Sequence, residues 1–262
     1  MSQRNWQSIK SYEDIKFEFF EGIGKITINR PKVYNAFRPE TNFEMLDAMA
    51  ICRERPDINV VVLTGEGDKA FCAGASFDEL VAIDSPEKGD HFFSGFAMVI
   101  NAMRTCPKLI IGRVHNKAVG GGVGLASSVD FCFATTKASV KLSELAVGIG
   151  PFVVGPAVER KVGLSAMSQM AIDATQWQSA QWAKEKGLYA EVYETVEEMD
   201  AAIETLVNKL ANSNPEAMHD LKTIFWQGTE HWDTLLFDRA KISGRLVLSE
   251  FTKNAINKFK AQ

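Results

Sequence analysis

The chain has 262 residues, a formal net charge of −4 at pH 7 and 46% hydrophobic residues, a balance typical of a soluble globular protein that can bury a sizeable core. It has no basic stripe, no apolar run long enough to span a membrane and no apolar segment at its N-terminus, which argues against a nucleic-acid partner, a membrane protein and a secretory signal. The four cysteines form no C-x-x-C pair, so we expect buried free thiols, no metal site and a cytoplasmic protein.

The N-terminal part of the chain alternates strand and helix signals. Apolar residues alternate with polar ones over residues 15–19, and a glycine turn separates them from a return strand at 25–28. Pro39 suits the first position of a helix, and the apolar residues after it recur at helical spacing as far as Met49. A continuous apolar run at residues 60–63 predicts a buried strand.

The same alternation continues through the middle of the chain. Residues 93–105 have a helical pattern, and residues 109–111 form another buried apolar run. A glycine-rich segment then opens a short helix that ends at Ser128, and a strand is expected at 131–133. Strands that alternate with helices imply right-handed crossovers and an α/β fold class.

Strand signals stop after about residue 195. The rest of the chain predicts helices over residues 197–210, 215–225, 231–248 and 251–259. We therefore expect two parts, a core at residues 1–195 and a helical region at 196–262. The helical region carries large apolar side chains, which need a surface to cover, either the core of their own chain or another subunit.

Two glycine-centred loops are the most informative feature of the chain. They span Ala70–Ser76 and Val119–Gly124, and the second follows a predicted strand and opens a helix. Each loop can direct a bare backbone N–H group at one point in space. Two such donors form an oxyanion hole, which stabilises negative charge on a carbonyl oxygen. The carboxylate of Glu144 follows the second loop, and this combination predicts chemistry on a thioester.

Five short motifs occur in order along the chain, and together they cover most of it. They are Asn29-Arg30-Pro31 with Asn35-Ala36-Phe37, Lys69-Ala70-Phe71-Cys72-Ala73-Gly74-Ala75, Gly120-Gly121-Gly122, Leu142-Ser143-Glu144 with Val147-Gly148, and Ala183-Lys184-Glu185-Lys186-Gly187-Leu188. This series resembles the crotonase (enoyl-CoA hydratase/isomerase) superfamily. The resemblance implies a ClpP/crotonase-like spiral of ββα turns over residues 1–195, a helical trimerisation region at 196–262, and a homotrimer or hexamer.

The resemblance also implies a set of site residues for an acyl-CoA substrate. The N–H groups of Ala75 and Gly121 correspond to the oxyanion donors, and Glu144 corresponds to the catalytic acid–base. The residues that correspond to coenzyme A contacts are Ala36, Phe37, Lys69, Ala73, Gly74, Ala75, Gly120 and Gly121. No cofactor is implied, since coenzyme A is part of the substrate, and no metal.

The chain departs from the family pattern at one position that matters for the reaction. The family often has a first glutamate where Gly124 lies, so that two carboxylates manage the water and the proton of a hydration. A single carboxylate, here Glu144, can move a proton between two carbons, which is double-bond isomerisation, or assist thioester hydrolysis. If the first carboxylate is simply missing, Gly124→Glu should raise hydration.

Likenesses within the superfamily point to different activities. Residues 119–190 look most like bacterial enoyl-CoA or methylglutaconyl-CoA hydratases, whereas Gly148–Phe152 resembles enoyl-CoA isomerases and Gly120–Leu125 resembles the hydroxyisobutyryl-CoA hydrolases. Residues 12–72 resemble the dihydroxynaphthoyl-CoA synthase branch. The resemblance therefore places enoyl-CoA hydratase first and isomerase second, with a thioester hydrolase or a non-catalytic acyl-CoA-binding or RNA-binding protein as alternatives.

Two further polar residues have simple structural explanations, and several apolar residues suit the wall of an acyl pocket. Glu159 stands beside Arg160 and Lys161, so a solvated charged surface is favoured over a second base. His115 stands at a strand end, where a lone histidine usually has a structural role. Bulky apolar residues are expected to form the acyl pocket and to favour a short or branched acyl group, namely Phe77, Leu80, Phe92, Phe93 and Phe152.

Overall fold

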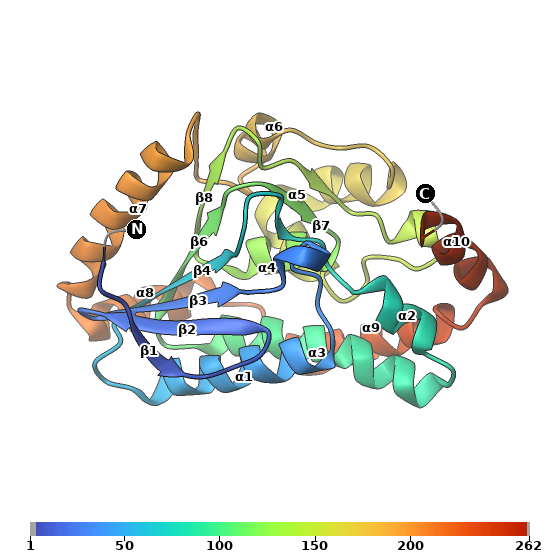
Figure 1. The fold of residues 1–262 in the computed structure, drawn as a ribbon, viewed down its shortest axis with the longest axis horizontal. Coiled ribbons are helices and arrows are strands. Elements are labelled where there is room, and N and C mark those ends of the chain that lie inside the picture. Colours follow the sequence, from blue (N-terminus) through green and yellow to red (C-terminus); the bar gives the residue numbers. More distant parts are fainter. Residues whose placement is uncertain (1–3, 261–262) are drawn as a thin grey trace.

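The structure, a computed structural model, describes residues 4–260 and is built around a seven-stranded sheet (Figure 1). The strand order is β1-β2-β3-β4-β6-β8-β10. The first three strands are antiparallel, and all neighbours from β3 to β10 are parallel. Their bounds are β1 Gln7–Lys10, β2 Ile15–Phe20, β3 Ile23–Ile28, β4 Val60–Gly65, β6 Leu109–Val114, β8 Phe131–Thr135 and β10 Glu191–Tyr193.

Helices cover both faces of this sheet, which explains the continuous apolar run of β4. Val61 and Leu63 belong to the main core cluster, which also holds side chains of helices α1 and α3. Val60 and Val62 point to the opposite face and pack in a second cluster with helix α7. Strands buried on both faces lose the polar alternation of a half-exposed strand. The helices are α1 Pro39–Glu54, α3 Pro86–Thr105 and α7 Val196–Ala211.

A second, smaller sheet determines where the glycine loops lie. Its three parallel strands have the order β5-β7-β9, with bounds β5 Ala70–Cys72, β7 Lys117–Val119 and β9 Val140–Lys141. The first glycine loop contains β5 and continues beyond its end, the second begins at the last residue of β7, and Glu144 follows β9. Because the carboxyl ends of neighbouring parallel strands share one edge, the sheet brings the three segments to the same edge.

The C-terminal helices cover the core of their own chain. Helix α9 buries Trp232, Leu236 and Ala240 and runs along α3 (Figure 1). The two helices touch at glycines, since a Cβ on Gly89 would lie 2.6 Å from the carbonyl oxygen of Gly244. The remaining elements are α2 Phe77–Ala82, α4 Gly121–Ser128, α5 Gly155–Ile172, α6 Ala180–Glu185, α8 Pro215–Phe225, α9 Trp232–Leu246, α10 Glu250–Lys260 and the 3₁₀ turns η1 Pro31–Val33 and η2 Leu145–Val147.

The predicted elements match the long helices and strands. Each of the four helices expected after residue 195 is confirmed as one of α7 to α10, and the strands expected between residues 15 and 133 are confirmed as β2, β3, β4, β6 and β8. The sequence patterns missed β1, β10, the whole of the smaller sheet and the helices α2, α5 and α6. The domain boundary at 195 and the assembly into trimers stay predictions.

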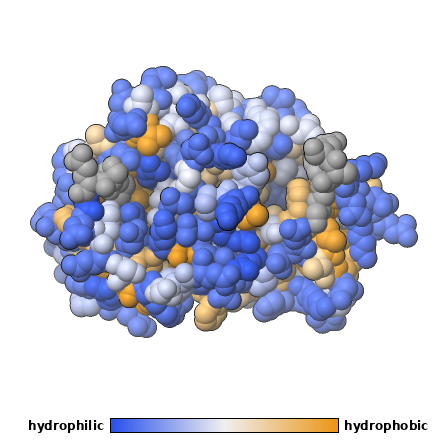
Figure 2. Space-filling model, viewed as in Figure 1, coloured by the Kyte–Doolittle hydropathy of each residue, from blue (hydrophilic) through white to orange (hydrophobic). Residues whose placement is uncertain are grey.

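The surface is largely hydrophilic on the face that Figure 2 shows. Hydrophobic atoms gather at the right of that face, where Figure 1 places α2 and α10. Exposed apolar side chains of these two helices include Phe77, Val81 and Phe251. Between residues 4 and 260, no helix combines the length and apolarity that crossing a bilayer requires.

Candidate active site

The first glycine loop is held in place from the N-terminal part of the chain. Asn35 is buried in the left-handed region, with a φ of 57°, which asparagine tolerates better than most residues. Its side-chain amide donates 2.9 Å hydrogen bonds to the carbonyl oxygens of Glu66 and Ala70, and its side-chain oxygen accepts one from the N–H of Arg30. The loop therefore starts from a fixed strand end.

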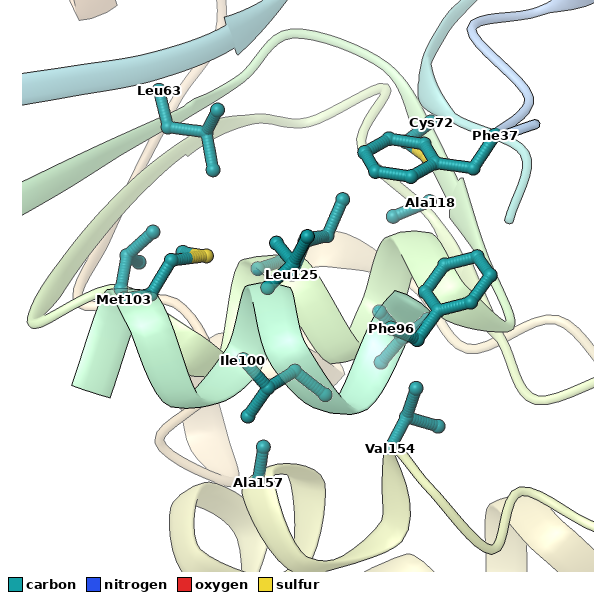
Figure 3. Packing of buried hydrophobic residues seen from close by; sticks show 14 of the residues in the cluster. Phe37, Leu63, Cys72, Phe96, Ile100, Met103, Ala118, Leu125, Val154 and Ala157 are labelled. Atoms are coloured by element: carbon teal, nitrogen blue, oxygen red, sulfur yellow. The ribbon is translucent and has the colours of Figure 1, made fainter. Parts of the chain in front are cut away.

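Backbone pairing with Phe37 orients the N–H group of Ala75. The N–H of Phe37 donates to the carbonyl of Gly74 at 2.7 Å, and the N–H of Ser76 donates to the carbonyl of Phe37 at 2.9 Å. These bonds use the residues on either side of Ala75 and leave its own N–H directed away from Phe37. The Phe37 ring is fully buried and stacks on Phe96 with ring centres 5.4 Å apart (Figure 3).

The two glycine loops pack directly against each other. A Cβ on Gly74 would lie 2.9 Å from the nitrogen of Gly121 and 2.7 Å from the carbonyl oxygen of Val119. A Cβ on Gly122 would lie 2.1 Å from the carbonyl oxygen of Cys72. Gly74 and Gly120 also have positive φ angles of 79° and 52°, which glycine adopts at no steric cost. Glycine is therefore required at positions 74, 120 and 122 for the two loops to pack in this way.

The N–H groups of Ala75 and Gly121 are free to bind a ligand. Among residues 4–260, neither group donates a hydrogen bond. Both residues line the same cavity as Glu144. Gly121 is also the first residue of α4, and a helix N-terminus carries a partial positive charge.

Among the residues that the structure describes, Glu144 is the only titratable side chain that lines this cavity. Its Oε2 atom is shielded from solvent and has no hydrogen-bond partner within the described chain. Its Oε1 atom lies 3.0 Å from the place where Gly120 would carry a Cβ, so the carboxylate rests against the second glycine loop. Burial raises the pKa of Glu144 to about 7, which makes its carboxylate a stronger base than an exposed one.

The cavity has a volume of about 100 Å³ and an apolar wall. Phe77, Leu80, Phe93 and Phe152 line it, as expected from the sequence. Phe92 does not line it, because its ring packs against the ring of Phe93 inside the core. The sequence patterns missed several other lining residues, which come from four different segments, namely Phe96, Val147, Ile149, Val154 and Ser243.

The space beside Gly124 is already filled. A Cβ at this position would lie 2.5 Å from Cγ1 and 2.6 Å from Cβ of Val154. Valine is branched at Cβ and cannot swing these atoms away. Figure 3 shows Val154 below Phe96, at the start of α5. The expectation that Gly124→Glu simply supplies a missing base is therefore wrong, because the structure leaves no room for the side chain.

A wider groove of about 380 Å³ adjoins the cavity and shares Ala73 and Val119 with it. Lys69 lines the groove, with its Nζ 5.9 Å from the ring centre of Tyr34. Ala36 and Phe37 line neither space and contribute through their backbones instead. The carbonyl of Ala36 accepts a hydrogen bond from Arg30, and Phe37 pairs with the first glycine loop. Contact of these residues with coenzyme A stays a prediction.

The remaining candidates have structural explanations. His115 is buried, and desolvation followed by the charge of Arg113 lowers its pKa to about 4, so it is neutral near pH 7. Glu159 is exposed, as expected for a solvated surface. The described residues hold no group of side chains that could ligate a metal ion. All four cysteines are buried free thiols, as predicted.

One prediction tests the contact between the loops. We expect Gly122→Ala to lower the free energy of unfolding by at least about 2 kcal/mol, because its Cβ would overlap the carbonyl of Cys72 and force the loops apart. Urea unfolding followed by circular dichroism measures this change. Gly155→Ala is the matched control, since its Cβ would meet only the flexible ends of Met167 and Arg239. Equal stability of the two variants would contradict the contact.

Comparisons with known proteins agree with this architecture. A solved enoyl-CoA hydratase from Bacillus halodurans is 17% identical, with a TM-score of 0.87, and the match covers 94% of this chain and 100% of that one. An enoyl-CoA hydratase/isomerase from Xanthobacter autotrophicus Py2 is 20% identical, with a TM-score of 0.87 and coverages of 96% of this chain and 94% of that one. An enoyl-CoA hydratase from Mycobacterium avium subsp. paratuberculosis K-10 is 23% identical, with a TM-score of 0.84 and coverages of 96% of this chain and 97% of that one. The crotonase fold expected from the motifs is therefore confirmed. A family model described as enoyl-CoA hydratase/isomerase matches residues 18–255, and the chain belongs to that family.

Proposed function

We propose that this protein is an acyl-CoA enzyme that forms an enolate and moves a double bond. The N–H groups of Ala75 and Gly121 bind the thioester oxygen and make the α-carbon acidic. The carboxylate of Glu144 removes a proton from the α-carbon, and the resulting enolate spreads its charge over the oxygen and the γ-carbon. The same carboxyl group then returns the proton to the γ-carbon, so a 3-enoyl-CoA becomes a conjugated 2-enoyl-CoA. No cofactor takes part.

The observation that carries this proposal is a single buried carboxylate in an apolar cavity. Hydration requires a positioned water and, in its simplest form, a second acid–base group. The place where the family often has that group is Gly124, and Val154 fills the adjoining space. Transfer of one proton between two carbons needs only one carboxylate, and the apolar wall favours a short acyl chain over water.

Enoyl-CoA hydratase is the second candidate. It is supported by the resemblance of residues 119–190 to hydratases and by the names of the similar structures. Thioester hydrolysis has less support, because it also consumes a water. A non-catalytic binding protein has the least support. A buried, unpaired carboxyl group with a raised pKa costs stability near pH 7, and a binding protein would gain nothing from that cost.

Two thioesters separate these activities. Incubation with 3-butenoyl-CoA should increase the absorbance of the conjugated thioester, whereas crotonyl-CoA should lose little of it. Rapid loss of the crotonyl-CoA absorbance would establish the hydratase instead. Thiol release from either substrate would establish a hydrolase, and the absence of any change would favour a binding protein.

The pH dependence of the isomerisation provides a further prediction. Only the ionised form of Glu144 can accept a proton, and its pKa is raised to about 7. We therefore expect kcat/KM to rise with pH, to level off above about pH 8, and to fall about tenfold per unit below pH 6. Initial rates between pH 5 and 9 measure this profile. A profile that is flat down to pH 5 would exclude the raised pKa.

A further inference from the structure

One polar side chain lies within the buried stripe of helix α9. Leu236, Ala240 and Ser243 recur at helical spacing on this stripe, and each is at most 1% exposed. Ser243 also lines the cavity that contains Glu144. Helix α9 therefore places a hydroxyl group in the wall of that cavity.

The hydroxyl group of Ser243 has no hydrogen-bond partner among residues 4–260. A serine inside a helix can instead bond the carbonyl group four residues earlier. Ser127 and Ser128 do so, with 2.8 Å hydrogen bonds to the carbonyl oxygens of Val123 and Gly124. Because Ser243 lacks such a bond, its hydroxyl group is available to a ligand in the cavity.

The packing of α9 against α3 shows where this hydroxyl group lies. The side-chain amide of Asn101 donates a 3.3 Å hydrogen bond to the carbonyl of Trp232, and a Cβ on Gly89 would touch Gly244. Between these two contacts, residue numbers rise along α9 and fall by the same amount along α3, so the helices are antiparallel. Ser243, which precedes Gly244, therefore lies beside the N-terminal end of α3.

The oxyanion donor Gly121 lies beside a later part of α3. A Cβ on Gly121 would lie 2.5 Å from Cε1 of Phe96. Phe96 follows Gly89 by about two helical turns, which is about 10 Å along the helix axis. Ser243 and Gly121 are therefore well separated along α3, although both line the same cavity.

The cavity has no positive charge to offer a ligand near Ser243. Among the described residues that line it, Ser143 and Glu144 are the other polar side chains, and none is a lysine, an arginine or a histidine. Glu144 rests against Gly120 in the second glycine loop. A carboxylate that a ligand buried beside Ser243 would thus lack a counter-ion, which is costly. A neutral hydrogen-bonding group suits this position better.

We propose that Ser243 selects an acyl group that carries a neutral oxygen, such as a hydroxyl group, beyond its γ-carbon. This inference rests on the proposed function, which places the thioester oxygen at Ala75 and Gly121 and the reacting carbons beside Glu144. The end of the acyl chain then reaches Ser243, whose hydroxyl group can both donate and accept a hydrogen bond. An alkyl chain of the same length would leave that hydroxyl group unpaired. Ser243 acts on binding alone and takes no part in proton transfer.

The test compares 6-hydroxy-3-hexenoyl-CoA with 3-heptenoyl-CoA, which has a methyl group in place of the hydroxyl group. We expect the wild-type protein to have at least about fivefold higher kcat/KM for the hydroxylated thioester. Ser243→Ala should remove this preference by raising KM for the hydroxylated thioester, with kcat little changed. Equal effects of Ser243→Ala on both thioesters, or none on either, would overturn the proposal.

Ser127→Ala is the matched control. Ser127 is also a buried serine of a helix, but its hydroxyl group is bonded within that helix and it does not line the cavity. Its variant should keep the wild-type preference between the two thioesters. A loss of preference in Ser127→Ala as large as that in Ser243→Ala would likewise overturn the proposal.

A binding measurement separates this proposal from the proposed function. Saturated 6-hydroxyhexanoyl-CoA and heptanoyl-CoA have no double bond to move, and calorimetry should show at least about fivefold tighter binding of the hydroxylated one to the wild-type protein but not to Ser243→Ala. If this pattern holds but no thioester is turned over, the role of Ser243 stands and the enzymatic function fails. If thioesters are isomerised but the wild-type protein binds both saturated thioesters equally, the role of Ser243 fails and the function stands.

Discussion

Glu144→Gln should reduce the turnover of 3-butenoyl-CoA by at least about 100-fold. The substitution keeps the shape of the side chain but removes the only group that we assign to proton transfer, and the loss of an acid–base group costs about 10²- to 10⁴-fold in rate. KM should change much less, because the N–H groups of Ala75 and Gly121 and the walls of the cavity are unaltered. Initial rates from the absorbance of the conjugated product measure both constants.

Two controls make this result interpretable. Glu159→Gln removes an exposed glutamate and should retain full activity. Glu144→Gln should also be at least as stable as the wild-type protein at pH 8. Burial raises the pKa of Glu144 to about 7, so the group stabilises the fold in its protonated form and loses that contribution as the pH rises from about 4.5 to 7. Activity near that of the wild-type protein would remove Glu144 from the mechanism.

Gly124→Glu should destabilise the protein by about 3 kcal/mol or more. The new Cβ would overlap Val154, and the new carboxylate would be buried without a partner. Urea unfolding measures the loss, with Val154→Gly as the single-site control. A Gly124→Glu protein that is as stable as the wild-type protein would show that Val154 does not occupy this space.

The double variant Gly124→Glu/Val154→Gly tests why the chain has one carboxylate. Removing the Val154 side chain opens the space beside position 124, so the double variant should be more stable than Gly124→Glu alone. With two carboxylates in one cavity, we expect its hydration of crotonyl-CoA to rise at least about tenfold above that of the wild-type protein. A stable double variant without this gain would mean that a second carboxylate is not what hydration lacks here.

The sequence predicts the large elements well because they bury repeating patterns. The continuous apolar residues of β4 pack against helices on both faces, and the helices after residue 195 show an apolar stripe at helical spacing. The smaller sheet was not predicted, because strands of two or three residues contain too few side chains to show a period. Its presence was detectable only through the glycine loops that follow it.

The candidate site was predicted in part, for a similar reason. Motifs identified Ala75, Gly121 and Glu144, which line one cavity in the structure. Val154 was not predicted, because its importance depends on a contact with Gly124 across 30 residues of sequence, and a pattern along the chain cannot reveal such a contact.

The most direct test follows the hydrogen that Glu144 is proposed to carry. A 3-butenoyl-CoA labelled with deuterium at the α-carbon is converted in ordinary water, and the product is analysed by NMR. The Oε2 atom of Glu144 is shielded from solvent, so we predict that the 2-enoyl product carries deuterium at the γ-carbon. Over the same time, Glu144→Gln should form at least about 100-fold less product. A product whose γ-carbon carries only solvent hydrogen would contradict transfer by one enclosed carboxylate.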